Sequence, residues 1–161
     1  MRPSKIVAVG QNYRAHAAEM GKGIPDEPLI FFKPSSAMIG PDEPILRPSG
    51  FERVDYEGEL VVVIGQRARR VNRADAHQVI LGFTIGNDVT VRELQKKDGQ
   101  YARAKGFDSF FPVGPRIVAG LDPAGLRLVT RVNGQVRQDS GTDDLIFSVP
   151  ELVEFISHHM T

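Results

Sequence analysis

The sequence contains no cysteine, and this absence removes three kinds of site together. Disulfide bridges, thiolate nucleophiles and cysteine-ligated zinc sites are all excluded. The chain also lacks a glycine-rich phosphate loop, a G-x-S-x-G nucleophile elbow and an H-E-x-x-H zinc motif. Nucleotide-dependent chemistry and a serine-hydrolase mechanism are therefore disfavoured, and we expect no organic cofactor.

A net charge and a long apolar run are absent as well. The 20 lysine and arginine residues equal the 20 aspartate and glutamate residues, so no global field attracts nucleic acid or an anionic membrane. The basic run at residues 67–73 contains no aromatic side chain and is interpreted as a solvated turn. No stretch approaches the roughly 20 apolar residues that span a bilayer, and the apolar run before Gln11 is too short for a secretory signal. We expect a cytoplasmic protein without nucleic-acid or membrane partners.

Short strands and a few short helices make up the predicted fold. The strands are expected at residues 5–10, 29–33, 56–64, 82–87, 127–132 and 135–138, and the helices at 13–20, 74–80, 91–96 and 149–158. The segment 34–48 carries four prolines and is expected to be extended. Because the strands outnumber the helices and do not alternate with them, the pattern favours an α+β, mainly β fold. No repeat or linker divides the chain, so we predict a single domain over residues 1–161.

Three local signals predict further detail. Asn133 and Gly134 are the strongest local indication of a type I′ hairpin. Ser148 and Glu151 have the spacing of a capping box at the start of the last helix. Residues 60–64 are apolar at every position, which indicates a strand buried on both faces.

Three carboxylates stand out by their positions. Glu57 and Glu59 are two residues apart on one predicted strand, so their side chains point to the same face. Two like charges near a core must be protonated, paired with basic groups or bound to a cation. Asp88 ends another predicted strand, and three carboxylates without cysteine favour Mg²⁺, Mn²⁺ or Ca²⁺. The alternative is a solvated sheet rim that Arg53 or Arg92 neutralises.

Two further positions are candidates for proton transfer and charge stabilisation. His16 and Glu19 are neighbours on a predicted helical turn, so the carboxylate can orient the imidazole as a base. The alternative is an exposed histidine with an incidental ion pair. Lys105 lies between a polar stretch and the apolar residues 110–112, where it could stabilise an enolate or carboxylate oxygen. A solvated lysine is the alternative there.

Taken together, several segments resemble the fumarylacetoacetate hydrolase family, in particular its shorter members. The matching segments, in chain order, are residues 10–19 (G-x-N-Y-x-x-H-x-x-E), 31–36 (F-x-K-P-x-S), 55–60 (D-Y-E-x-E-L), 86–95, 104–108 and 133–147. No single segment is specific for the family, but the occurrence of all of them in this order along nearly the whole chain is specific for it. The resemblance implies a mixed β-sheet roll with short peripheral helices, and a homodimer.

The same resemblance implies a divalent metal site. Glu57, Glu59 and Asp88 correspond to the ligands of Mg²⁺ or Mn²⁺, with Ca²⁺ as a further option. Lys105 would stabilise the developing oxyanion and contact the substrate together with Gln95.

Residues at the N-terminal end are implied to take part in the reaction. His16, oriented by Glu19, would activate water, and the segment 11–24 would form a lid over the substrate. The implied substrates are small 2-oxo or 1,3-dicarbonyl acids of aromatic catabolism. The implied reaction is metal-dependent hydrolysis of a C–C bond of the acylpyruvate or fumarylacetoacetate type through an enolate. An isomerase of 2-hydroxyhepta-2,4-dienedioate and an oxaloacetate decarboxylase are alternatives on the same site.

One departure from the family pattern leaves a third alternative open. Family members continue with a strand and a T-P-x-G-V-G loop that helps to hold the substrate, and this sequence ends at Thr161 without them. The chain is expected to be a fragment or a natural truncation. A non-catalytic metal-binding domain is the rival interpretation.

Overall fold

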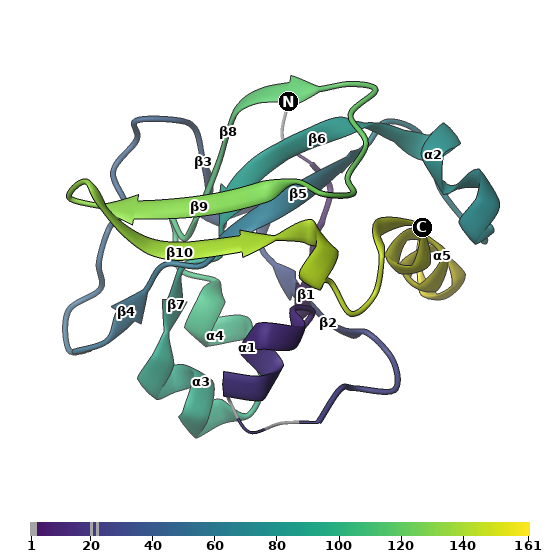
Figure 1. The fold of residues 1–161 in the computed structure, drawn as a ribbon. Helices are drawn as coiled ribbons and strands as arrows, with labels where there is room; N and C mark the ends of the chain where they lie inside the picture. Colours follow the sequence, from purple (N-terminus) through teal and green to yellow (C-terminus); the bar gives the residue numbers. More distant parts are fainter. Residues whose placement is uncertain (1–2, 20, 22) are drawn as a thin grey trace. The chain divides into compact units, whose positions relative to one another are not determined.

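The computed structural model describes residues 3–19, 21 and 23–161 (Figure 1). The chain divides into two compact units. Unit 1 combines the residues up to Ala8 with Ile30–Leu60 and Ile85–Pro115, and unit 2 combines Val9–Leu29, Val61–Thr84 and Arg116–Thr161. Each unit is described by itself below.

Strands dominate the described part of the chain. They are β1 (Ile6–Gly10), β2 (Leu29–Lys33), β3 (Met38–Ile39), β4 (Val54–Asp55), β5 (Gly58–Ile64), β6 (Ile80–Asn87), β7 (Thr90–Val91), β8 (Phe111–Val118), β9 (Arg127–Val132) and β10 (Gln135–Gly141). One sheet has the order β3-β8-β6-β5, and β1-β2, β4-β7 and β9-β10 form two-stranded sheets. The β3–β8 pair is parallel, whereas β4–β7 and β9–β10 are antiparallel. The predicted α+β, mainly β class is confirmed.

The helices are short. They are α1 (Arg14–Glu19), α2 (Ala76–Val79), α3 (Arg92–Asp98), α4 (Ala102–Lys105) and α5 (Val149–His159), with single 3₁₀ turns η1 (Ser35–Ala37), η2 (Arg73–Asp75) and η3 (Thr142–Asp144). Among the described residues, no helix has the length and apolar character needed to cross a bilayer.

Unit 1 is built on an apolar cluster that supports two turns. The buried side chains of the cluster are Val89, Val91, Leu94, Ala104 and Phe110, and Phe107 packs against them. The rings of Phe107 and Phe110 lie 5.1 Å apart between centroids, and the amide of Val89 donates to the carbonyl of Phe110 at 3.2 Å. Val89 and Ala104, which are next to Asp88 and Lys105 in the sequence, belong to this cluster. The packing of the cluster therefore fixes the backbone at both polar residues.

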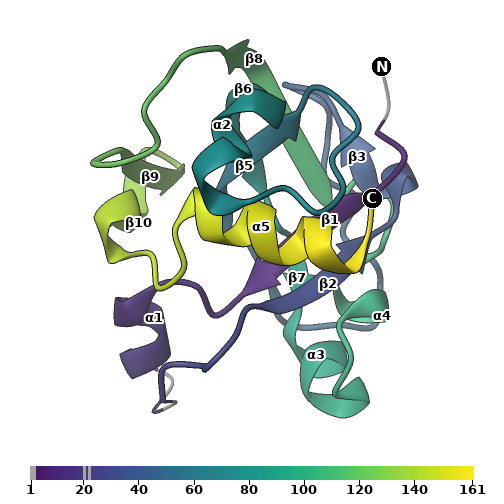
Figure 2. The same cartoon turned by 90° about the vertical axis from the view of Figure 1, so that its right-hand side faces the viewer.

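A β-hairpin and a capped helix form part of unit 2. Asn133 and Gly134 both have positive φ, 51° and 77°, as a type I′ turn requires, and β9 pairs with β10 on either side of them. Ser148 and Glu151 form the predicted capping box, in which the amide of Ser148 donates to Glu151 at 2.7 Å. Figure 2 shows α5 beside α2, against which it packs. Both local predictions are confirmed.

Two expectations are corrected. Residues 60–63 are half-buried and Ile64 is 47% exposed, so β5 is not buried on both faces. The basic run is more than a solvated turn, because Arg69 donates to the carbonyl groups of Ser157 and His158 at 2.8 and 2.9 Å. Arg69 thereby satisfies carbonyl groups at the C-terminal end of α5 that no later helical turn can satisfy.

Strand β8 and helix α4 are among the elements that were not predicted from the sequence. Strand β8 contains Pro112 and Pro115, which interrupt the strand pattern in the sequence. Its first residues nevertheless pair in parallel with β3. Helix α4 is a single turn after Tyr101, too short to produce a helical periodicity.

Candidate active site

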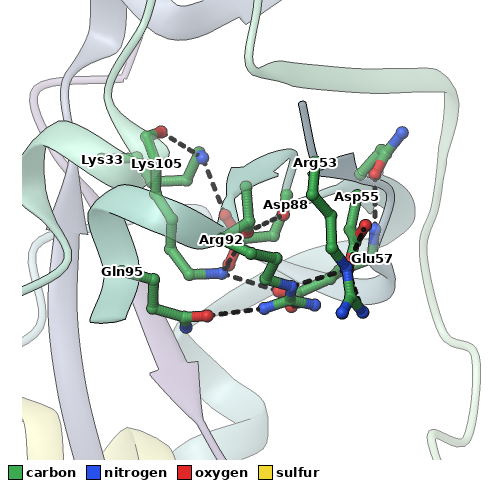
Figure 3. Close-up of polar contacts among 10 residues, drawn as sticks. Lys33, Arg53, Asp55, Glu57, Asp88, Arg92, Gln95 and Lys105 are labelled. Carbon is green, nitrogen blue, oxygen red and sulfur yellow. Dashed lines mark hydrogen bonds and ion pairs between the residues drawn. The ribbon is translucent and has the colours of Figure 1, made fainter. Parts of the chain in front are cut away.

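Lys105 lies at the centre of a buried polar cluster in unit 1 (Figure 3). Its side chain is 4% exposed, and its ammonium group contacts Glu57 Oε2 and Asp88 Oδ2, each at 2.6 Å. A third contact, to Thr90 Oγ1, measures 2.8 Å. The three protons of the ammonium group therefore have three acceptors, and two carboxylate oxygens converge on one cation.

Asp88 lies between two buried lysines. While Lys105 contacts Oδ2, Lys33 Nζ donates to Oδ1 at 2.7 Å, and the Lys33 side chain is fully buried. The same Lys33 Nζ also donates to the main-chain carbonyl of Lys105. Burial lowers the pKa of Lys33, and the attraction of Asp88 acts in the opposite direction.

Arg92 forms a second layer next to Glu57. Its Nη2 lies 2.6 Å from Glu57 Oε1, and its Nε lies 2.7 Å from Asp55 Oδ2. Its Nη1 donates to the side-chain oxygen of Gln95 at 2.8 Å. Burial tends to raise the pKa of Asp55, but hydrogen bonds from Arg53 and Arg92 hold it below the usual value. Glu57 is thus held between Lys105 and Arg92.

Backbone pairing places these side chains together. Strands β4 and β7 pair Asp55 with Thr90, and the amide of Asp88 donates to the carbonyl of Glu57 at 2.8 Å. The amide of Glu57 in turn donates to the side-chain oxygen of Asn87 at 2.8 Å. The segment before β5 and the turn after β6 are therefore locked to each other at the positions of the two carboxylates.

The structure brings together four of the residues predicted from the sequence: Glu57, Asp88, Lys105 and, through Arg92, Gln95. Glu59 is half-buried in β5. The side chains of His16 and Glu19 lie outside the described residues, as do Met20 and Lys22 of the predicted lid.

Helix α1, which carries His16 and Glu19, is anchored within unit 2. The side-chain amide of Asn12 donates to the carbonyl of Phe147 at 3.0 Å and accepts from its amide at 2.8 Å. Asp144 accepts from the amide of Ala15 in the first turn of α1 at 2.9 Å. The asparagine of the N-terminal motif therefore has a positional role.

Sequence reasoning missed Lys33 and assigned Arg92 only a neutralising role. Lys33 ends an apolar strand and precedes Pro34, a position where a lysine usually reaches solvent. Its burial depends on Asp88, 55 residues away in the sequence. No local pattern reveals a contact of that range.

The donor set has the chemistry of a site for a hard cation. Glu57 and Asp88 each direct one oxygen at the same positive charge, here the ammonium of Lys105. Among the side chains that the structure describes, which do not include those of His16 and Glu19, no three histidine, aspartate or glutamate groups lie close enough together to bind a metal. The carboxylates therefore fit a divalent ion in type, while Lys105 occupies the position between them.

Known proteins match the chain along nearly its whole length. The family described as fumarylacetoacetate (FAA) hydrolase C-terminal matches residues 5–161. An uncharacterized protein of Methanocaldococcus jannaschii is 50% identical over 161 residues, which are 100% of this chain and 68% of that protein. Oxaloacetate tautomerase YisK of Bacillus subtilis is 41% identical over 167 residues, covering 99% of this chain and 56% of the tautomerase.

A solved structure is similar as well. It is the crystal structure of 5-carboxymethyl-2-hydroxymuconate delta-isomerase from Mycobacterium smegmatis, with 52% identity and a TM-score of 0.92. The match covers 99% of this chain and 64% of that one. This chain therefore spans between 56% and 68% of the length of the three proteins.

Proposed function

Because the chain belongs to the fumarylacetoacetate hydrolase family, we propose that it forms the catalytic part of a metal-dependent enzyme that acts on small 2-oxo or 1,3-dicarbonyl acids. The observation that carries the proposal is the convergence of Glu57 and Asp88 on the buried ammonium of Lys105. Such an arrangement of charge in a water-poor site is suited to stabilising an enolate.

The proposed metal ligands are Glu57, Glu59 and Asp88, which would hold Mg²⁺ or Mn²⁺. Oxygen donors without sulfur match these hard cations. When bound, such an ion supplies Lewis acidity toward substrate oxygens.

The remaining roles belong to side chains of the chain itself. Lys105 places its ammonium group where an enolate oxygen develops negative charge. Gln95, whose oxygen is held by Arg92 at 2.8 Å, keeps its amide hydrogens for the substrate. His16, oriented by Glu19, is the proposed proton-transferring base, and the segment 11–24 is the proposed lid.

Enol–keto proton transfer is the proposed reaction, and C–C hydrolysis is the second candidate. The similar proteins named oxaloacetate tautomerase and delta-isomerase support the first. The pairing of His16 with Glu19 that the sequence predicts supports the second, because hydrolysis needs a base that activates water. Decarboxylation of oxaloacetate would use the same enolate.

A calorimetric titration tests the metal site. We expect Mg²⁺ and Mn²⁺ to bind the chain and Glu57→Ala to abolish binding, because the substitution removes a ligand and leaves Asp88 as the one carboxylate paired with both Lys33 and Lys105. Glu52→Ala is the matched control, since that side chain is exposed. A folded parent chain that binds neither ion would refute the proposal.

The reaction is tested next by adding the enol form of oxaloacetate and, separately, an acylpyruvate to the metal-loaded chain. Loss of the enol absorbance without cleavage supports the tautomerase, and release of pyruvate from the acylpyruvate supports the hydrolase. The homodimer and the cytoplasmic location expected from the sequence stay predictions. Metal binding without turnover of either substrate would favour the non-catalytic alternative.

A further inference from the structure

We propose that Lys33 is a positioning residue of this site: it holds Asp88 and the end of α4 so that Asp88 Oδ2 and the Lys105 ammonium group face Glu57. This inference rests on the proposed function for its consequence in the enzyme. Its structural part concerns four residues of unit 1, namely Lys33, Glu57, Asp88 and Lys105, and stands on their contacts alone.

The two carboxylate oxygens of Asp88 contact two different lysines, Lys33 and Lys105. It donates to Oδ1 at 2.7 Å, while Oδ2 lies 2.6 Å from Lys105 Nζ. A carboxylate held by one oxygen cannot rotate about its last side-chain bond without breaking that contact. The oxygen that faces Glu57 is thereby fixed, whether an ammonium group or a metal ion stands before it (Figure 3).

The second contact of Lys33 reaches Lys105 itself. Lys33 Nζ donates to the main-chain carbonyl of Lys105, the last residue of α4. That carbonyl lies in the last turn, where no later helical amide can reach it. One buried cation thus fixes both the carboxylate and the backbone from which the Lys105 side chain projects.

Stability alone does not account for a lysine at this position. The Lys33 side chain is fully buried, and replacing both partners of a buried ion pair by apolar side chains of similar volume is often neutral or stabilising. An apolar residue, however, would leave Asp88 Oδ1 without this donor. The ammonium group of Lys33 therefore determines the orientation of the Asp88 carboxylate.

The test compares Lys33→Met with Lys96→Met, the same substitution at an exposed lysine on α3. We expect Lys33→Met to raise the Kd for Mg²⁺ by about 10–100-fold, the usual effect of losing a partner of a metal ligand. Without metal, we expect faster proton exchange of the ¹⁵N-labelled Lys105 ammonium group. Lys96→Met should change neither. A folded Lys33→Met chain with parental Kd and parental Lys105 exchange overturns the proposal.

Chemical rescue separates charge from volume. In Lys33→Ala, n-propylammonium replaces the missing part of the side chain, and n-propanol fills the same space without charge. We expect the ammonium compound alone to restore slow exchange at Lys105 and tight metal binding. Equal rescue by both compounds means that Lys33 acts through packing, which contradicts the proposal.

A measurement on the parent chain covers the case in which neither variant folds. On adding Mg²⁺, we expect the Lys33 ammonium resonance to stay in place while the Lys105 resonance moves. A Lys33 resonance that moves with that of Lys105 contradicts the proposal. If Mg²⁺ does not bind at all, the proposed function fails, and the metal-free exchange of Lys105 in a folded Lys33→Met chain still decides the role of Lys33.

Discussion

Each carboxylate of the site lies between two basic side chains. Glu57 lies between Lys105 and Arg92, and Asp88 lies between Lys105 and Lys33. Lys105 is the group shared by both carboxylates, so it neutralises the repulsion between them. A divalent ion between the same oxygens would take over that task and release the ammonium group.

Lys105→Met is therefore expected to have opposite effects with and without metal. In the metal-free chain, the loss of a buried cation is expected to lower the free energy of unfolding by roughly 3–5 kcal/mol. Binding of Mn²⁺ should become tighter, because no ammonium group competes for Glu57 and Asp88. Thermal unfolding with and without Mn²⁺ measures both effects. A variant that binds Mn²⁺ more weakly than the parent would show that Lys105 supports the metal instead of competing with it.

At this scale, sequence patterns identified the acidic residues better than their partners. The spacing of Glu57 and Glu59 and the strand-ending position of Asp88 drew attention to them. Lys33 contacts Asp88, 55 residues later in the sequence, and Arg92 contacts Glu57, 35 residues earlier. Contacts between residues so far apart in the sequence leave no periodic pattern. Partners of that kind become visible only when the chain is folded.

Elements with a local cause could be predicted, and elements without one could not. The hairpin follows from two residues that tolerate positive φ, and α5 follows from its capping box. Strand β8 was missed because its two prolines interrupt the sequence pattern of a strand. Its pairing with β3 is a contact between residues far apart in the sequence. Local chemistry therefore explains boundaries, while sheet partners depend on the whole fold.

The capping box makes the stability of α5 dependent on pH. Hydrogen bonds from the side chain and amide of Ser148 hold the pKa of Glu151 below its usual value of 4.5. A depressed pKa means that the folded state favours the carboxylate, so this contribution is complete above pH 4.5 and is lost as the pH falls below it. We expect Glu151→Gln to lower stability at neutral pH and to flatten the acid limb of the stability curve. Denaturant unfolding at several pH values measures the free energy of unfolding of the parent and of Glu151→Gln, with Glu52→Gln as control. Equal dependence of this free energy on pH in the parent and in Glu151→Gln would contradict the expectation.

At the scale of the whole chain, charge and surface character act together. The formal net charge is zero at pH 7, with a pI of about 6.9, and several apolar strand residues are about half exposed. They are Ile64, Leu81, Ile85, Ile117 and Val118. Family membership, like the net charge, could be predicted from the sequence because its motifs are spread over the whole length, whereas the exposure of these strand residues depends on the fold.

Self-association is expected to be strongest near neutral pH. Without net charge, no repulsion opposes contact between exposed apolar surfaces. Light scattering over a range of about two pH units on either side of the pI measures this, and Ile117→Lys should reduce it. Association that does not vary with pH would show that surface charge is not the controlling factor.

The balance of charges around Asp88 implies an order in which partners arrive. The cluster contains four cations, Lys33, Arg53, Arg92 and Lys105, against the carboxylates Asp55, Glu57 and Asp88, and the proposed metal ligand Glu59 adds a fourth carboxylate. Their charges cancel, so an anionic acid meets no attracting field there. A divalent ion would leave two positive charges in excess. The acid would then bind only to the metal-loaded protein, which makes the sequence compulsory: metal first, anion second.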